Sequence, residues 1–337
     1  MAESRLAAQN VVNASKRIAG HVYRTPLQRA LWLEKYTGAK ESRVFLKLES
    51  EQVTGSFKAR GAMNKVMCLT EEEKAKGVIT ASTGNHALAV THAAQESAGN
   101  LKFEIVLPNT ASAAKVELLK ALGAPVRFFG DDCLLAEEEA IRISKTTGQV
   151  YVSPYNDKDV LAGQGTLAVE ILEQLGDGTK LDAIFVPVGG GGLISGVASY
   201  IKSVSPETKV YGCNPKNDAH MARSVAAGEL IDVDSYTENG GVTLSEGTAG
   251  AVEQGSITFP ICQQTVDEWM ELTEEEIGLA VTEMLDKHHK AIEGAAGLGI
   301  AAYKRKAKEL AGKNVAIVLC GGNVKASMIR DVLNKYL

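Results

Sequence analysis

The residue of this sequence best placed to act as a nucleophile is Lys58, just inside the start of an expected helix. It lies in residues 54–62, TGSFKARGA, where Ser56 can cap that helix. A lysine amine at the edge of a rigid element loses its proton when it is partly desolvated, and the unprotonated amine forms Schiff bases with carbonyl compounds. For this residue alone, a solvated surface lysine is the alternative. Three downstream motifs favour the chemical role.

The first motif is a run of glycines between an expected buried strand and an expected helix: Gly189, Gly190, Gly191 and Gly192, followed by Leu193. Successive backbone amides in such a run can approach an anion closely, and the helix N-terminus adds its positive end. The run therefore predicts a phosphate site. A plain tight turn is the alternative, although four consecutive glycines cost backbone entropy.

The glycine run does not fit the common nucleotide-binding motifs. A dinucleotide site needs a third glycine at a fixed place and an acidic residue after the next strand, where this chain has Cys213 and Asn214. A Walker loop needs Gly-Lys followed by Ser or Thr, and the run is not followed by them. A single phosphate group is the better interpretation, and a nicotinamide oxidoreductase is disfavoured.

The second motif follows another expected strand and consists of Ser82, Thr83, Gly84, Asn85 and His86. Hydroxyl groups, a side-chain amide and free helix amides meet at such a turn, which suits a carboxylate. Asn85 can equally bond a phenolic oxygen. An ordinary helix N-cap is the alternative interpretation.

The third motif, Cys320-Gly321-Gly322-Asn323, lies at an expected strand end near the C-terminus. A thiol at this place is a weak, uncharged hydrogen-bond partner for a ring nitrogen. An ordinary buried cysteine is the alternative for Cys320 taken alone.

The elements that must position the second motif alternate regularly between about residues 77 and 152. Expected strands at 78–80, 103–107, 126–129 and 150–152 are separated by expected helices at 87–96, 113–122 and 134–146. Strict alternation indicates an open, mostly parallel sheet with helices on both faces. We expect residues 75–152 to form a small domain inserted in a larger, cofactor-binding domain made of residues 1–74 and 153–337.

The larger part repeats this pattern. Its expected strands are 44–48, 183–188, 209–213 and 314–319, and its expected helices are 6–22, 160–175, 193–202, 274–289, 295–310 and 325–336. The less periodic residues 228–258 are expected to be loops near the site, because irregular connections often carry function. The expected fold class is α/β with two twisted, mostly parallel sheets.

Composition excludes several classes of protein. The 337 residues carry 36 Lys and Arg against 41 Asp and Glu, for a net charge of −5, with no basic stripe for nucleic acid. The apolar runs are strand-sized and too short to span a membrane, and residues 1–5 lack a secretory signal. Five scattered cysteines suggest no zinc site or disulfide framework. A cytoplasmic protein is expected.

These motifs, taken in order, resemble those of the fold type II pyridoxal-phosphate enzymes, in the branch of serine/threonine dehydratases and serine racemases. The likeness covers nearly the whole chain. It includes residues 47–49 (KLE), residues 162–166 (AGQGT) and residues 292–295 (IEGA) besides the lysine and glycine motifs.

The resemblance implies a role for each site residue. Lys58 would hold pyridoxal 5'-phosphate through its amine and later act as the base at the substrate α-carbon, so it is a catalytic residue. The expected cofactor-binding residues are Phe57, Lys58, Asn85, Gly189, Gly190, Gly191, Gly192, Leu193, Glu293 and Cys320. The expected substrate-binding residues are Ser82, Thr83, Asn85 and His86, with the carboxylate as the group held.

The resemblance also implies the reaction. An uncharged partner at the ring nitrogen leaves the ring a soft electron sink, which favours loss of a β-hydroxyl over transamination. The expected function is a dehydratase (ammonia-lyase) of L-threonine and L-serine that gives a 2-oxo acid and ammonia. The family likeness suggests a homodimer. A serine racemase or a threo-3-hydroxyaspartate dehydratase on the same scaffold remains the alternative.

Two residues of the site depart from the family's pattern. Cys320 stands where most relatives of this branch have Ser, and both are uncharged. Thr83 stands where racemases carry a serine that handles the proton on the opposite face of the substrate, and where many dehydratases have alanine. A hydroxyl at position 83 keeps racemisation possible, so Thr83 is a second candidate catalytic residue.

Two activators found among relatives are not expected here. Metal-binding relatives use carboxylates where this chain has Asn214 and His220, and a hard divalent cation prefers charged oxygen ligands. No metal site is therefore expected. Ala30, Leu31 and Val53 replace the polar nucleotide contacts of the animal racemases, so activation by ATP is not expected either.

The sequence leaves two matters open. A catalytically silent module that binds a phosphate ligand is the rival from another class, and Lys58 argues against it. Substrate preference depends on the loops at residues 153–156 and 246–250, whose conformation the sequence does not give.

Overall fold

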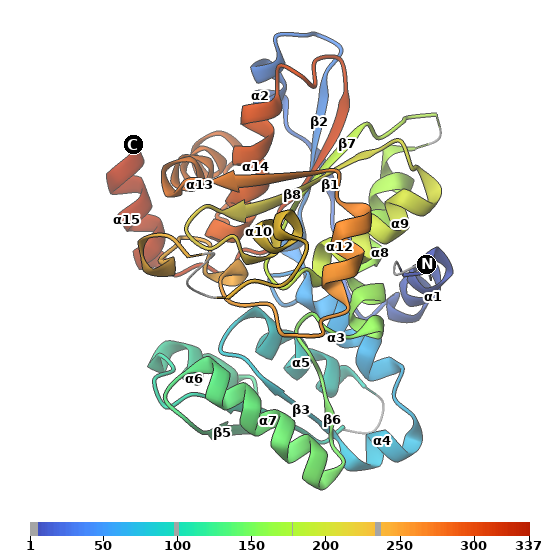
Figure 1. Ribbon diagram of the computed structural model, residues 1–337, viewed down its shortest axis with the longest axis vertical. Helices are drawn as coiled ribbons and strands as arrows, with labels where there is room; N and C mark the ends of the chain where they lie inside the picture. Colours follow the sequence, from blue (N-terminus) through green and yellow to red (C-terminus); the bar gives the residue numbers. More distant parts are fainter. Residues whose placement is uncertain (1–5, 98–100, 177, 233–236) are drawn as a thin grey trace.

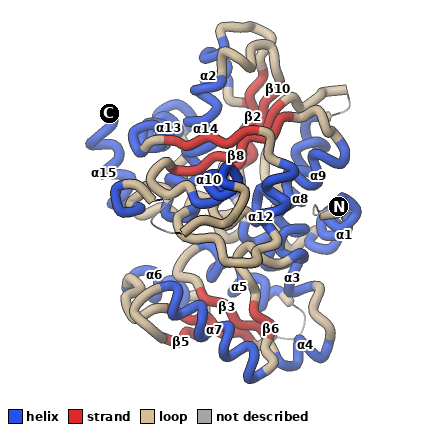
Figure 2. Tube along the Cα trace, viewed as in Figure 1, coloured by secondary structure: helices blue, strands red, loops and turns tan. Residues whose placement is uncertain are grey.

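The structure is a computed structural model that describes residues 6–97, 101–176, 178–232 and 237–337. Within these ranges it contains two sheets, which stand one above the other in Figures 1 and 2. The six-stranded sheet has the order β1 (Leu27–Arg29), β2 (Arg43–Lys47), β10 (Asn314–Val318), β7 (Ala183–Pro187), β8 (Lys209–Pro215) and β9 (Glu268–Leu272). The four-stranded sheet has the order β5 (Val126–Phe128), β4 (Phe103–Leu107), β3 (Val78–Ala81) and β6 (Val150–Tyr151).

Both sheets are parallel except at one edge. Strand β1 runs antiparallel to β2, and every other pairing is parallel. Buried residues fill all five positions of β7, as expected for a central strand covered on both faces. The α/β class with two mostly parallel sheets is therefore confirmed. The division into domains at residues 74/75 and 152/153 stays a prediction; the four-stranded sheet spans Val78 to Tyr151.

Helices flank both sheets in Figure 1. The first half of the chain contains α1 (Ala8–Ile18), α2 (Leu31–Glu34), α3 (Lys58–Met67), α4 (Glu71–Lys76), α5 (Asn85–Glu96), α6 (Ala113–Ala121), α7 (Cys133–Thr147) and α8 (Lys158–Leu175). The second half contains α9 (Gly192–Val204), α10 (His220–Ala227), α12 (Thr258–Thr265), α13 (Glu274–His288), α14 (Gly294–Lys306) and α15 (Ala326–Tyr336). Short 3-10 turns include η2 (Glu49–Glu51), η3 (Asn239–Gly241) and η4 (Glu246–Thr248).

The prediction from the sequence did not include several helices and strands, and it made one helix too long. Strands β1 and β9 were not expected, and neither were α2, α10 and α12. Strand β1 is too short to show a period, and β9 carries charged Glu268 and Glu271 among its apolar residues. The first helix spans 11 residues instead of the expected 6–22, because Gly20 turns the chain with a φ of 86°. Residues 1–5 and 233–236, on which the leader and part of the loop expectation fall, lie outside the described residues.

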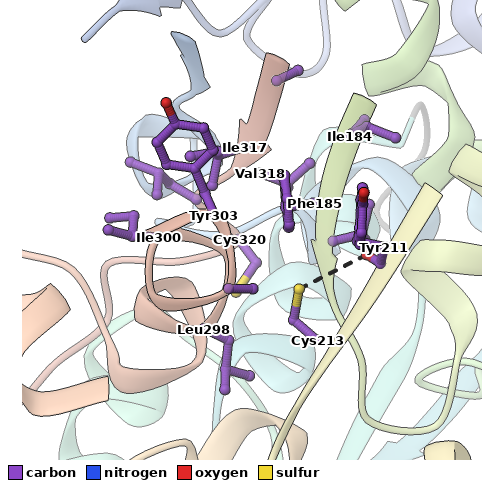
Figure 3. Close-up of a cluster of buried hydrophobic side chains, with 14 of the residues drawn as sticks. Ile184, Phe185, Tyr211, Cys213, Leu298, Ile300, Tyr303, Ile317, Val318 and Cys320 are labelled. Carbon is purple, nitrogen blue, oxygen red and sulfur yellow. Dashed lines mark hydrogen bonds between the residues drawn. The ribbon is translucent and has the colours of Figure 1, made fainter. Parts of the chain in front are cut away.

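The main core lies between the six-stranded sheet and its helices. Figure 3 shows part of it, where Phe185 on β7 stacks on Tyr211 of β8 with ring centroids 4.4 Å apart. The Tyr303 ring of α14 meets Phe185 edge to face at 6.0 Å. Cys320 belongs to the same buried cluster. The third motif therefore starts from a packed, rigid region. No helix in the described ranges is both long enough and apolar enough to span a membrane.

Helix α8 packs between α3 and α9 through glycines. A Cβ added to Gly163 of α8 would lie 2.5 Å from the backbone oxygen of Arg60 on α3. A Cβ added to Gly196 of α9 would lie 2.2 Å from the backbone oxygen of Leu161 on α8. Since α3 begins at Lys58 and α9 begins at the glycine run, α8 sets how far apart these two helix starts lie.

A methyl group at Gly163 should loosen this three-helix contact. We expect Gly163→Ala to lower the free energy of unfolding by about 1–3 kcal/mol, because the neighbour is backbone and cannot rotate away. Gly297→Ala in α14 is the matched control, since its added Cβ would meet nothing closer than 3.2 Å. Urea denaturation followed by circular dichroism compares the two. Equal stability of both variants would contradict the close packing of α3 on α8.

Candidate active site

A cavity of about 660 Å³ opens between the loops of the two sheets. Every site residue expected from the sequence lines it: Phe57, Lys58, Ser82, Thr83, Asn85, His86, Gly189, Gly190, Gly191, Gly192, Leu193, Glu293 and Cys320. Three motifs far apart in the chain therefore meet the lysine in one place. The roles given to these residues stay predictions.

Backbone pairing joins the lysine turn to the Cys320 loop. Ser56 and Gly321 form an antiparallel bridge. The amide of Phe57 donates to the carbonyl of Cys320 at 3.0 Å, and the amide of Gly322 donates to the carbonyl of Gly55 at 2.9 Å. Gly55 has a φ of 75°, and a Cβ there would collide with Asn323. The residue before the lysine is thus held directly against the residue that carries the thiol.

The Lys58 amine is half-buried in the cavity wall. Its Nζ donates to the backbone oxygen of Pro154 at 2.7 Å and lies 5.2 Å from the centre of the Phe57 ring. Desolvation lowers the pKa of Lys58 to about 8, against the smaller opposing effects of Cys320 and Glu293. At neutral pH a useful fraction of this amine is unprotonated, which is the state that a nucleophile or a base requires.

The glycine run makes a concave wall that admits no side chains. A Cβ on Gly190 would lie 2.6 Å from the ring of Tyr155, and one on Gly189 would lie 2.9 Å from the backbone of Thr248. The Gly190 carbonyl is fixed by the Thr258 hydroxyl, which donates to it at 2.7 Å. The first amides of α9 have no carbonyl partner inside the helix, so they are free to hold an anion.

The second motif presents another helix start to the cavity. The Ser82 hydroxyl accepts from the amide of Gly84 at 3.2 Å, which shapes the turn before α5. His86 is buried, and its Nε2 lies 2.9 Å from the carbonyl of Val152. Burial and the nearby Lys58 lower the pKa of His86 to about 3, so the ring is neutral and its Nε2–H donates to Val152. At this position the backbone N–H, rather than the ring, is available to a carboxylate.

A chain of polar contacts links the second and third motifs. Asn85 Nδ2 donates to both carboxylate oxygens of Glu293, at 3.0 and 3.2 Å. Asn323 Nδ2 donates to Asn85 Oδ1 at 2.7 Å and to the carbonyl of Thr54 at 2.8 Å. The Cys320 thiol lies 3.7 Å from Glu293. These contacts fix the orientation of the Asn85 amide.

Burial raises the pKa of both acidic groups at this place, Glu293 and Cys320. It raises the pKa of Glu293, with hydrogen bonds from Asn85 and Cys320 opposing it. It also raises the pKa of the Cys320 thiol well above its ordinary value, and Glu293 adds to that rise. The thiol is therefore an uncharged donor at neutral pH.

Some cavity residues were not singled out as site residues from the sequence. Asn323 and Tyr155 were named only as parts of a motif and a loop, yet both contact expected site residues. Lys115 of α6 lines the cavity and approaches Glu246 of η4 at 4.0 Å. A lysine in an amphipathic helix gives no sequence signal for this position, because it matches a solvated face equally well.

The two residues at the relatives' metal position differ in how far their side chains are engaged in other contacts. Asn214 Nδ2 donates to the carbonyl of Val188 at 2.8 Å, whereas its Oδ1 is buried without a hydrogen-bond partner. The Nδ1 atom of His220 accepts from the amide of Val252 at 2.6 Å, and its Nε2 lies 2.8 Å from the carbonyl of Ile231. Across the described ranges, His, Cys, Asp and Glu form no group of three or more that suits a metal ion.

The cavity residues fit pyridoxal 5'-phosphate on three counts. The amine of lowered pKa suits its aldehyde, the side-chain-free glycine wall suits its phosphate, and the uncharged thiol suits its ring nitrogen. No cationic side chain is needed at the phosphate, because free helix amides and the helix dipole supply the positive potential.

Comparison with known proteins agrees with this fit. Residues 18–321 match the family described as "Pyridoxal-phosphate dependent enzyme". The L-threonine ammonia-lyase of Thermotoga maritima is 40% identical over 332 residues, covering 98% of this chain and 79% of the relative. The processed threonine deaminase isoform 2 of Solanum lycopersicum superposes with a TM-score of 0.87 at 31% identity, covering 97% and 92%. Maize serine racemase gives a TM-score of 0.86 at 31% identity, covering 98% of both chains.

The pH dependence of Lys58 reactivity tests the electrostatics of the cavity. Below its pKa of about 8 the amine is protonated, so its rate of reductive methylation should rise about tenfold per pH unit up to that value. Above about pH 8 the rate should level off, whereas an ordinary lysine keeps gaining reactivity to about pH 10.4. Peptide mapping by mass spectrometry measures the rate at Lys58 in the cofactor-free protein. A rate that keeps rising beyond pH 10 would contradict the desolvated environment.

Proposed function

The chain belongs to the pyridoxal-phosphate dependent enzyme family, and from that premise we propose that it is a dehydratase (ammonia-lyase) of L-threonine and L-serine. It would convert these amino acids to a 2-oxo acid and ammonia by β-elimination. The observation that carries the proposal is the meeting of Lys58, the glycine run and Cys320 in one cavity. The threonine ammonia-lyase and threonine deaminase relatives support the choice of substrate.

The proposed cofactor contacts follow the three motifs. Lys58 Nζ would carry pyridoxal 5'-phosphate covalently, with Phe57 beside the ring and the amides of Gly189 to Leu193 on the phosphate. Asn85 Nδ2 and the Cys320 thiol, which both donate to Glu293 in this structure, would turn to the ring oxygen and to the ring nitrogen respectively. When bound, the cofactor supplies an electron sink for the pair left on the substrate α-carbon.

The chain's own groups would orient the substrate and move its proton. The amides at the start of α5, with the side chains of Ser82 and Thr83, would hold the substrate carboxylate beside the helix N-terminus. Lys58 Nζ, with its pKa near 8, would take the α-proton, because a base works best when its pKa lies near the operating pH. The Pro154 carbonyl, which accepts from this amine at 2.7 Å, would keep it oriented.

The neutral surroundings of the ring nitrogen favour elimination. Cys320 brings no full charge to that position, so the α-carbon electron pair would be used to expel the β-hydroxyl, which would leave as water with the proton that Lys58 took from the α-carbon. The enamine product then takes up water and loses ammonia to give the 2-oxo acid. The loops at residues 153–156 and 246–250 contribute Tyr155 and Glu246 to the cavity, where the substrate side chain would lie.

Two observations support alternative substrates or outcomes on the same scaffold. The Thr83 residue lines the cavity together with Lys58, which supports a serine racemase activity with two opposed acid–base groups. Lys115 lines the same cavity and would suit the second carboxylate of threo-3-hydroxyaspartate. Glu246 partly neutralises this lysine at 4.0 Å, which favours the uncharged substrates.

Location and assembly complete the proposal. We propose a cytoplasmic homodimer that needs neither a metal ion nor a nucleotide for activity. Engagement of both ring nitrogens of His220 by backbone groups supports the absence of a metal requirement.

A substrate panel tests the proposed function. The purified protein, loaded with pyridoxal phosphate, should release 2-oxo acid from L-threonine and L-serine, with and without Mg²⁺, and faster than from D-serine or threo-3-hydroxyaspartate. Coupled reduction of the 2-oxo acid measures the rates. A preference for threo-3-hydroxyaspartate, or D-serine formed from L-serine as fast as 2-oxo acid, would replace the dehydratase by one of the alternatives.

Replacement of Thr83 separates elimination from racemisation. We expect Thr83→Ala to keep kcat/KM for 2-oxo acid release within about fivefold, because Lys58 performs the proton transfer that elimination needs. Any D-serine formation should be abolished, since the hydroxyl on the opposite face is gone. Chiral chromatography of the product serine gives the second rate. Parallel loss of both activities would make Thr83 a contact for the substrate rather than an acid or base.

A further inference from the structure

Residues from three motifs of the sequence meet in one buried cluster of charges, and none of the residues in this cluster lines the cavity. The cluster contains Lys47 of β2, Glu49 of η2, Arg60 of α3 and Glu170 of α8. The first two belong to residues 47–49, Arg60 follows Lys58 by two residues, and Thr166 of residues 162–166 also contacts Arg60. Lys47, Glu49 and Arg60 are fully buried, and Glu170 is 9% exposed.

Arg60 is the centre of this cluster. Its Nε and Nη2 donate to the two oxygens of Glu49 at 2.7 and 2.9 Å. Its Nη1 and Nη2 donate to the two oxygens of Glu170 at 2.6 and 2.9 Å. A planar guanidinium that forks to two carboxylates at once fixes angles as well as distances. It therefore holds α3 against η2 and against α8 in one orientation.

With the remaining contacts, the cluster has no net charge and its polar groups are hydrogen-bonded. Lys47 Nζ donates to Glu170 at 2.5 Å, to the Thr25 carbonyl at 2.8 Å and to Gln174 at 3.1 Å. The Thr25 hydroxyl donates to Glu49 at 2.6 Å. Burial lowers the pKa of Lys47, against the opposing attraction of Glu49 and Glu170. Two cations face two anions, so the cluster as a whole adds no net charge to the interior.

A gain in folding stability does not by itself explain why these four charged residues are buried together. The cost of removing four charges from water roughly cancels their attraction, and apolar residues of similar size are often as stable. Bidentate hydrogen bonds between buried ions also fix the directions in which the partner elements meet, which apolar contacts do not require. Here the geometry concerns α3, whose first residue is Lys58, and α8, which packs on α9 beside the glycine run.

We propose that the Lys47–Glu49–Arg60–Glu170 cluster is a positioning device that fixes the Lys58 amine relative to the glycine run, so that one cofactor reaches both. This inference rests on the proposed function, in which Lys58 carries pyridoxal phosphate. The four residues touch neither the cofactor nor the substrate. They act through the helices that carry Lys58 and the phosphate site.

The test compares the rate at which the cofactor-free protein acquires a borohydride-reducible adduct at Lys58 from pyridoxal phosphate. The main variant is Lys47→Met/Glu170→Leu, which removes one cation and one anion and leaves Arg60 paired with Glu49. The cluster then stays neutral and apolar groups fill its space, so we expect the melting temperature to stay within a few degrees. We expect the rate of adduct formation to fall about tenfold or more, because small misplacements of reacting groups are costly.

A second variant keeps the positive charge at position 60 and removes only the bidentate hydrogen bonds of the guanidinium. Arg60→Lys preserves the cation but cannot donate to both carboxylates with fixed angles. We expect it to slow adduct formation as well, and it decides the matter if the double variant does not fold. Ile143→Ala, in the separate buried cluster around α7, is the control for a loss of stability without any change near α3 or α8.

The outcomes are distinct. Slow adduct formation in the two cluster variants, with the control at the wild-type rate, supports positioning. Wild-type rates in the cluster variants would overturn it, and so would an equal slowing in Ile143→Ala at the same melting temperature. If the unaltered protein forms no adduct at Lys58, the proposed function fails instead.

Discussion

The backbone pairing between residues 55–57 and 320–322 is the interaction on which the rest of the site depends. It ties the lysine turn to the end of the central strand β10, which belongs to the main buried core. Main-chain hydrogen bonds define this contact, so side-chain motion does not change it. The backbone segments that carry the amine and the thiol therefore keep a fixed relation, and the other motifs need only be brought to the same cavity by the two sheets.

One physical effect, desolvation, shapes the chemistry of the cavity. It lowers the pKa of Lys58 and His86 and raises the pKa of Glu293 and Cys320, so each group moves towards its uncharged form. The anions of the cofactor and the substrate are instead offered helix starts, at α5 and α9, whose positive potential does not depend on pH. The site thus separates the groups that exchange protons from those that bind anions.

Much of this arrangement was predictable from local pattern. The alternation of strands and helices gave the α/β class, and each motif of the cavity lies at a strand-to-helix turn that glycines or polar residues mark in the sequence. Strands β1 and β9 were not predicted from the sequence, because β1 is only three residues long and β9 carries charged residues. The pairing of Arg60 with Glu170 joins residues 110 positions apart. No periodicity reveals such a contact, so the buried cluster appears only in three dimensions.

The most direct test of this account is a crystal structure of the chain grown with pyridoxal 5'-phosphate. We expect continuous density from Nζ of Lys58 into the pyridine ring, with the phosphate on the amides of Gly189 to Leu193 and the ring nitrogen at the Cys320 thiol. A cofactor that is not joined to Lys58, or a phosphate bound away from the glycine run, would contradict it.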